Sequence, residues 1–357
     1  MLTRRALVLT PAALVAAATI PLAPIRLPRR LRVAILGLDG HTSEIIDQSN
    51  RLPDIEIVSV SDADPKALAK FMAKPQLIKA KPYADARQML DREKLDLVAI
   101  CNNNGERAAA ILDCLSRKLD VIAEKPFALN TADLNKIKVA AAESHTKLGM
   151  LLPMRFDPEY LALRQIVNEG LIGEVAQIAS QKSYKAGVRA PWYLKRATYG
   201  GTIAWIGIHM IDLMRYTSGR EFKEVLGMQS HIGFPELGEM ENVTVSTFKL
   251  DNGGIASLRM DYLRTESAAT HGDDRLRLAG TRGIAEYQAS TGVTLMTSSQ
   301  KPHVIESLPA KQSVFVDFLN SAYNGKPANL TLADMYRVTE ITIAAQRAAD
   351  QGTLIKI

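Results

Sequence analysis

The lysine in "VIAEKPF", residues 121–127, is the first side chain of this sequence that could do chemistry. An apolar run ends there, and Glu124 and Lys125 follow it at once. Lysine is costly to bury, but its ammonium group can orient a hydroxyl or stabilise an alkoxide as it forms. We therefore predict that Lys125 serves a reaction at the end of a buried strand. The alternative is an ordinary charged pair in a loop.

A histidine in "YGGTIAWIGIHMIDLMRYTSG", residues 199–219, is the second candidate. The apolar spacing after Gly200-Gly201 predicts a helix, with Trp205 on the face of His209 and Asp212 three residues beyond it. A histidine that faces a cleft could take a hydroxyl proton during hydride transfer. The alternative is a histidine satisfied within the core.

Alternating strands and helices would place Lys125 at the edge of a parallel sheet. Short apolar runs predict buried strands, and stretches of helical spacing separate them. The strands are predicted at residues 31–38, 55–64, 95–104, 119–126 and 147–155, and the helices at 41–52, 65–73, 106–118 and 131–145. Pro65 fits a first helical position and Thr131 an N-cap. This pattern predicts an α/β fold with a doubly wound parallel sheet.

The alternation stops after about Met154, so we place a domain boundary near residue 152. Consecutive strands without helices between them predict an antiparallel sheet. The strands are expected at 175–184, 222–232, 242–250, 253–263 and 275–288, with helices at 158–173 and 331–350. Thr331 fits the N-cap of the last helix.

Residues at the carboxyl ends of the parallel strands predict a dinucleotide site, because open parallel sheets bind ligands there. Gly37 fits the first position of the G-x-G-x-x-G fingerprint, whereas Asp39 and Thr42 stand at the other glycine positions. Asp62 follows Gly37 at about the spacing of an acid that binds the adenosine ribose. No arginine follows Asp62 directly, which favours NAD over NADP. The alternative for Asp62 is a solvated strand end.

The strand that starts at residue 95 ends in further polar residues. Asn102 and Asn103 could bind a ribose or a nicotinamide amide, or they could form a polar turn. Cys101 closes the same apolar run, and Cys114 lies in the following helix. The two cysteines have neither CxxC nor zinc-ligand spacing, so we expect two buried thiols and no metal site.

The N-terminus reads as a targeting segment rather than as part of the fold. Arg4 and Arg5 precede an apolar, alanine-rich stretch, the layout of a twin-arginine export signal. We assign residues 1–28 to it, with an uncleaved anchor or a leader as alternatives. No later stretch is apolar for long enough to cross a membrane. The net charge is +6, but the basic residues are spread along the chain, which argues against nucleic-acid binding.

Several motifs occur in the same order as in one known family: "AEKPFAL", "PMRFDPEY", "EGLIGEV", "APWY", the segment 199–219 and the closing helix. From Leu31 to the end the chain resembles the glucose–fructose oxidoreductase / inositol dehydrogenase / rhizopine catabolism (Gfo/Idh/MocA) family. The resemblance implies a Rossmann-type doubly wound parallel sheet in residues 29–152. It also implies an α+β domain with an open, mostly antiparallel sheet in residues 153–357.

The family resemblance also implies roles for individual residues. Lys125 and His209 match the catalytic pair. We predict cofactor binding by Gly37, Asp39, Thr42, Asp62, Asn102, Asn103, Glu124 and Lys125, and substrate binding by Arg155, Trp192, Trp205 and Asp212. Family members oxidise or reduce sugars, cyclitols and polyols with NAD or NADP and commonly form dimers or tetramers.

Three departures from the family pattern set this chain apart. Trp205 replaces an aspartate four residues before the histidine, and it could supply a stacking face for a sugar ring. Asp39 and Thr42 replace small residues of the nucleotide loop, and Arg107 lies near a histidine position of the family. These changes bear on substrate binding and on cofactor binding.

We expect an exported NAD-dependent oxidoreductase, with NADP the less favoured cofactor, acting on a sugar, polyol or glycoside. Outside the cytoplasm little free NAD is available, so the cofactor should be tightly bound. One alternative is an NAD-dependent glycosidase or lyase that returns the hydride to the same sugar. Another is a non-catalytic sugar-binding protein on the same scaffold.

Overall fold

The fold is known from a computed structural model that describes residues 24–357. The predicted export signal therefore lies outside the described residues, except for its last part. There the backbone N–H of Leu27 donates to the Asp54 carboxylate at 3.0 Å. No helix of the described range combines the length and the apolar character that a bilayer span requires.

Within residues 24–357 the first sheet has six parallel strands in the order β3-β2-β1-β4-β5-β6. The strands are β1 (Leu31–Leu36), β2 (Ile55–Ser61), β3 (Lys81–Tyr83), β4 (Leu97–Ile100), β5 (Asp120–Glu124) and β6 (Leu148–Leu151). The helices are α1 (Thr42–Ile46), α2 (Pro65–Met72), α3 (Ala86–Arg92), α4 (Asn104–Ser116) and α5 (Thr131–Ser144). Strand order reverses direction at β1 and β4, and such a switch point forms the crevice in which this fold binds ligands.

The second sheet has nine strands within the described range, in the order β14-β13-β12-β11-β7-β10-β9-β8-β15. The strands are β7 (Val175–Lys185), β8 (Phe222–Ser230), β9 (Val243–Leu250), β10 (Ile255–Arg264), β11 (Gly272–Gly280), β12 (Gly283–Gln288), β13 (Gly292–Thr297), β14 (His303–Val304) and β15 (Ile355–Lys356). β7 and β10 pair in parallel, while the other neighbours run antiparallel. The predicted combination of a parallel sheet and a mostly antiparallel sheet is confirmed.

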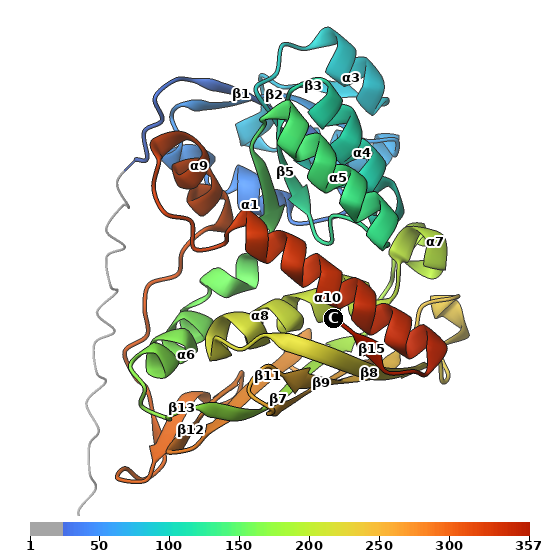
Figure 1. Ribbon diagram of the computed structural model, residues 1–357. Helices are drawn as coiled ribbons and strands as arrows, with labels where there is room; N and C mark the ends of the chain where they lie inside the picture. Colours follow the sequence, from blue (N-terminus) through green and yellow to red (C-terminus); the bar gives the residue numbers. More distant parts are fainter. Residues whose placement is uncertain (1–23) are drawn as a thin grey trace, which may run out of the picture.

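Among residues 24–357, the helices cover one face of the second sheet (Figure 1). The helices of this part are α6 (Pro158–Asn168), α7 (Arg196–Tyr199), α8 (Ile208–Ser218), α9 (Val314–Asn324) and α10 (Leu332–Gln351). α6, α8 and α10 contact β12, β7 and β8, respectively. The side chains of β9 alternate between buried and exposed positions, as expected when one face of a sheet is covered and the other is not.

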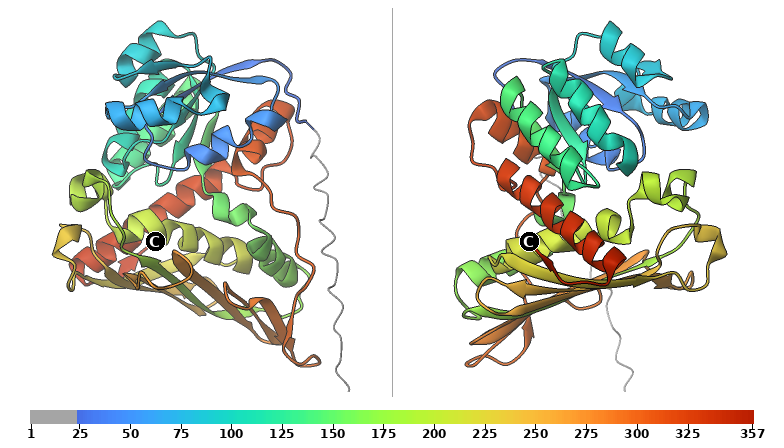
Figure 2. Two further views of the ribbon diagram at one scale, coloured as in Figure 1. Left: turned by 180° about the vertical axis from the view of Figure 1, so that it is seen from behind. Right: turned by 45° about the vertical axis from the view of Figure 1, so that its right-hand side comes forward.

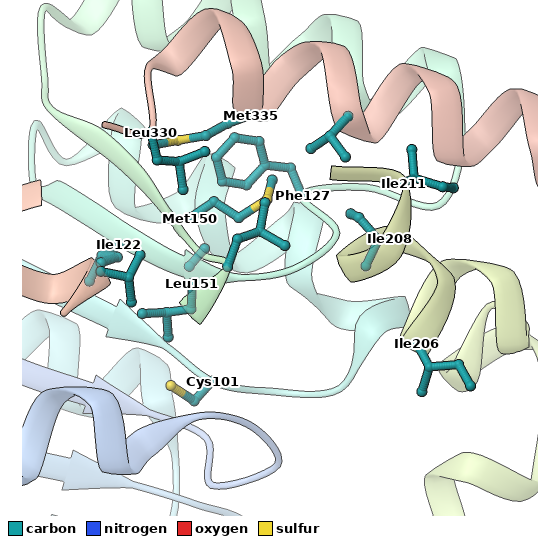
Figure 3. Packing of buried hydrophobic residues seen from close by; sticks show 14 of the residues in the cluster. Cys101, Ile122, Phe127, Met150, Leu151, Ile206, Ile208, Ile211, Leu330 and Met335 are labelled. Atoms are coloured by element: carbon teal, nitrogen blue, oxygen red, sulfur yellow. The ribbon is translucent and has the colours of Figure 1, made fainter. Parts of the chain in front are cut away.

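The last two helices return to the first sheet. α9 contacts β6 and α1, and α10 contacts α5 and β6 as well as α8 (Figure 2). The two halves of the chain therefore share a core around the site. Figure 3 shows Phe127, Met335 of α10 and Ile208 of α8 as members of one cluster of buried hydrophobic residues. Because Phe127 is fully buried two residues after Lys125, it fixes the turn that carries the lysine.

The helix predicted over 203–216 is interrupted at its start. Ile203–Gly207 form a π-turn, and the α-helix begins only at Ile208. The predicted α-helix is therefore confirmed only from Ile208 onward, and the shared face of Trp205 and His209 stays a prediction. Single π-turns are rare and are often found at functional sites.

Other local differences have simple physical causes. The predicted helix at 41–52 is a five-residue helix, α1, followed by a 3₁₀ turn, Ser49–Arg51. The N-cap of α5 is Asn130, whose side chain accepts from the N–H of Asp133, and not Thr131. Thr331 caps α10 in a capping box with Asp334, as expected. β3 and α3 were not predicted. β3 is a three-residue strand with mostly exposed residues, and α3 has only seven residues.

Candidate active site

Lys125 is buried at the point where β5 ends. Its side chain is 1% exposed, and Nζ donates to the carbonyl oxygen of Trp205 at 2.6 Å. The ammonium also lies over the indole ring of Trp205, 3.3 Å from the ring centroid. Burial lowers the pKa of Lys125 to about 7, although the carboxylate of Glu124 opposes that shift. Near neutral pH this amine can therefore both accept and donate a proton.

His209 is also buried, on the first turn of α8. Burial lowers its pKa well below the usual range, and the positive charges of Lys125 and Lys182 lower it further. The imidazole is therefore neutral and can accept a proton. Its Nδ1 is a buried atom without a hydrogen-bond partner in the described residues. The structure thus brings together the two side chains that we predicted as a pair.

Glu124 joins this group from the neighbouring backbone position. Its Oε1 lies 2.5 Å from Nδ1 of His41 and also accepts from the backbone N–H of His41. Burial alone would raise the pKa of Glu124, but His41, Lys125 and Arg107 outweigh it and lower that pKa to about 2. The carboxylate is therefore ionised inside the protein. His41 was not among the predicted site residues. The sequence did contain a signal for it, because a histidine stands in a loop that is expected to carry small residues.

Two tryptophans close the other side of the group. Trp192 donates from Nε1 to Asp39 at 2.8 Å, and its ring contacts Trp205 edge-to-face with centroids 5.2 Å apart. Tyr193 stacks on Trp192 with centroids 3.8 Å apart. Burial raises the pKa of Asp39 to about 6, although its bond to Trp192 opposes the shift. Trp192 and Trp205, both predicted to bind substrate, thus form one aromatic wall beside Lys125.

A cavity of about 580 Å³ opens at the carboxyl ends of β1, β2 and β4. It is lined by Gly37, Asp39, Ser61, Asp62, Asn102 and Asn103, among others. Ser61 Oγ and Asn102 Oδ1 are buried without partners in the described part of the chain, so they remain free to bind a ligand. Gly37 has a φ of +79°, and a Cβ on it would lie 2.6 Å from Cα of Asn102. These features fit the adenosine half of a dinucleotide.

The loop that would face the pyrophosphate is more acidic than the fingerprint requires. Its N–H groups at Asp39 and His41 already donate to Cys101 O and to Glu124, respectively. Thr42 N–H bonds within the loop, to Gly40 O at 2.8 Å. The cavity thus fits the adenosine half of NAD as it stands. In the loop, by contrast, a pyrophosphate would have to compete with Glu124 for the N–H group of His41.

The bonds of Arg155 and Asp212 do not involve Lys125. They form a buried ion pair with each other, and Arg155 also bonds Asp334 of α10 at 3.2 Å. Their predicted role in substrate binding stays a prediction, since the bonds that they make join the 3₁₀ turn Pro153–Phe156, α8 and α10.

Two further cations are buried: Arg107, which the sequence showed as a departure near a histidine position of the family, and Lys182, which was not predicted. Arg107 donates to the carbonyl oxygens of Lys125, at 2.8 Å, and of Pro126 and Asn102, so it holds the backbone of the lysine turn. Lys182 of β7 pairs with Asp274 at 2.8 Å. Among residues 24–357, no group of three or more His, Cys, Asp or Glu side chains could hold a metal ion. Cys101 and Cys114 are free and buried, as expected.

The parallel sheet, the cavity at the carboxyl ends of its strands and the buried lysine and histidine fit an NAD-binding oxidoreductase, and sequence comparison agrees. Residues 31–151 match the oxidoreductase family with an NAD-binding Rossmann fold, and residues 160–286 match the GFO/IDH/MocA C-terminal domain. The matches together cover more than half of the chain. The protein belongs to the Gfo/Idh/MocA family of oxidoreductases.

Several relatives have names that specify a reaction. The chain is 24% identical to myo-inositol 2-dehydrogenase of Thermotoga maritima, over 74% of this chain and 78% of that protein. It is 25% identical to D-glucoside 3-dehydrogenase of Escherichia coli, over 92% and 97%. A solved structure of a Thermotoga maritima protein assigned as an oxidoreductase is 32% identical, with a TM-score of 0.85, over 92% and 100%.

Proposed function

We propose that this protein oxidises or reduces one alcohol carbon of a sugar, polyol or glycoside with NAD, and that Lys125 and His209 handle the proton. The observation that carries the proposal is the burial of both side chains in one group beside the nucleotide cavity. The relatives that act on inositol and on a glucoside support the substrate class.

The two side chains have complementary properties for this reaction. In its protonated form Lys125 can bind the reacting oxygen and stabilise negative charge on it. Its pKa of about 7 also lets the amine give up or take a proton near neutral pH. His209, neutral because it is buried, can take the hydroxyl proton. NAD, when bound, supplies the carbon that accepts the hydride. Trp192 and Trp205 offer flat apolar faces of the kind on which a sugar ring packs.

Export remains part of the proposal. It rests on the paired arginines and the apolar stretch of residues 1–28. In an exported enzyme the cofactor must stay bound through both half-reactions. A second sugar, or the same sugar after a change at its glycosidic bond, then returns the oxidised or reduced cofactor to its starting state.

We also propose that the uncovered face of the second sheet pairs two copies of the chain. Met228, Val245 and Ile255 are exposed there on neighbouring strands, with exposed fractions of 65%, 41% and 50%. Analytical ultracentrifugation of the purified protein, compared with Val245→Glu, tests this dimer. A wild-type monomer at micromolar concentration would rule it out.

A non-catalytic sugar-binding protein is the second candidate, because Trp205 covers the ammonium of Lys125. The deciding experiment incubates purified protein with a panel of sugars, polyols and glycosides. Nicotinamide absorbance and product release are both followed, and the nucleotide released on denaturation is identified. Absence of bound nucleotide together with no NAD binding would refute the enzyme. Release of an aglycone without net reduction of NAD would favour the glycosidase or lyase version.

Replacing Lys125 by Met separates catalysis from binding. An enzyme should lose turnover by at least about 100-fold, since general acid–base and electrostatic contributions are of that size. A pure binder should keep its sugar affinity and show no turnover before or after the change. Lys185→Met is the control and should leave both quantities unchanged, since Lys185 is a half-buried lysine at the end of β7 that donates to Glu266 O.

A further inference from the structure

The nucleotide loop, residues 37–42, carries His41, whose ring is oriented by a carboxylate as the ring of a general base is. His41 uses both its backbone N–H and its Nδ1 to contact one oxygen of Glu124. The carboxylate can only accept, so the imidazole must donate from Nδ1. That bond fixes the tautomer in which Nε2 carries the free lone pair. Nε2 of His41 has no hydrogen-bond partner among the described residues.

The position of this imidazole connects the buried site with its surroundings. The rings of His41 and His209 meet edge-to-face, with centroids 5.5 Å apart. The side chain of His41 is 33% exposed, whereas Lys125 and His209 are 1% and 6% exposed as residues. The Lys125 ammonium is directed to Trp205 O rather than to solvent. His41 therefore contacts His209 and is also accessible to water, whereas Lys125 and His209 are buried.

We propose that His41 is the proton-relay residue of this site. In the oxidation direction the C–H electron pair leaves the substrate as hydride for the nicotinamide, and the hydroxyl proton goes to His209. That proton then passes, directly or through one water molecule, to Nε2 of His41. Glu124 stabilises the imidazolium, which releases the proton to solvent. Reduction runs the same path in reverse. The inference rests on the proposed function and adds a residue outside the family's lysine–histidine pair.

The relay explains why the acid Glu124, at the end of β5, faces the loop. A carboxylate beside a pyrophosphate costs binding energy, since like charges repel. Glu124 compensates because its carboxylate holds the ring and the tautomer of His41, as an aspartate does for a catalytic histidine. Gly40 makes the contact possible, since a Cβ there would lie 2.4 Å from the Glu124 side chain.

The first test needs no substrate. Nitrogen-15 NMR of histidine-labelled protein reports the tautomer of each of the six imidazoles, and the His41→Asn spectrum assigns the signal of His41. We expect the Nδ1–H tautomer for His41 in the wild-type protein. A neutral Nε2–H tautomer would overturn the relay, whatever the substrate proves to be.

The second test is kinetic and uses the full chain with its cofactor. Asparagine keeps a donor for Glu124 but cannot accept a proton, so His41→Asn should lower kcat roughly 10- to 100-fold. Its affinity for NAD should change less than about threefold, added imidazole should restore part of the rate, and the solvent isotope effect on kcat should rise. His303→Asn, at an exposed histidine of β14, is the matched control.

The outcomes separate the two proposals. A wild-type protein without turnover on any substrate contradicts the proposed function, while the NMR result still decides the His41 geometry. An active wild type with an equally active His41→Asn variant refutes the relay alone. Loss of NAD affinity in proportion to loss of rate would also refute it, because His41 would then position the cofactor.

Discussion

Replacing Lys125 by methionine should stabilise the protein while it abolishes turnover. The pKa of this buried amine is about 7, against 10.5 for an ordinary lysine. One pKa unit corresponds to about 1.36 kcal/mol, so keeping the proton in the folded state costs about 4 kcal/mol at pH 7. Methionine has a similar length without the charge. Loss of the bond to Trp205 O removes about 1 kcal/mol, which leaves an expected gain of about 3 kcal/mol.

The pH dependence gives this prediction its sign. The unfolded chain binds more protons at Lys125 than the folded chain between the two pKa values. The cost is therefore complete below about pH 7, shrinks as the pH rises and vanishes above about pH 10.5. Urea unfolding of the wild type and of Lys125→Met, across this range, measures the difference in the free energy of unfolding.

A second buried lysine is the matched control. Lys182 is also fully buried, but Asp274 outweighs burial and raises its pKa. Its stabilising effect is present below the usual lysine pKa and is lost only in strong alkali. Lys182→Met should therefore destabilise the protein, by about 3 kcal/mol, because it leaves Asp274 unpaired. A Lys125→Met variant that is less stable than the wild type at neutral pH, or a difference independent of pH, would refute the reasoning.

Three further outcomes are expected. His209→Asn should lower kcat roughly 100-fold or more with little change in NAD affinity, measured by calorimetry; unchanged kcat would exclude the histidine from proton transfer. Asp62→Ala should weaken NAD binding about tenfold. It should also reduce the preference for NAD over NADP, since Arg87 lines the same cavity and could then bind a 2′-phosphate. Titrations with both nucleotides measure this, and an unchanged ratio of the two affinities would contradict it. Glu124 has a lowered pKa, about 2 against 4.5, so its stabilisation, about 3 kcal/mol, is present above pH 4.5 and is lost as the pH falls towards 2. In acid unfolding, the Glu124→Gln variant should not show this loss of stability between pH 4.5 and 2. The same acid transition in the variant and the wild type would contradict an ionised, buried Glu124.

The fold was predictable from the sequence because its signals are local. Apolar strands of four to seven residues alternate with amphipathic helices, and that pattern alone indicates a parallel sheet. Lys125 was predictable for the same reason, since it directly follows a buried strand. The π-turn at Ile203–Gly207 was not, because over so few residues α and π spacing leave the same apolar pattern.

The rest of the site depends on pairs that are distant in the sequence. Glu124 and His41 are 83 residues apart, and Trp192 and Asp39 are 153 apart. A sequence pattern identifies the residue types but not which of them meet. Asp39 therefore looked like a defect in the nucleotide loop, whereas in the folded chain it is the acceptor for Trp192.

The aromatic wall has a practical consequence for experiments. The chain contains two tryptophans: Trp205 lies against the ammonium of Lys125, and Trp192 contacts the ring of Trp205. All the indole fluorescence of the protein thus originates at the place where cofactor and sugar would meet. Emission intensity, and energy transfer from indole to reduced nicotinamide, report occupancy without any label or added reporter group.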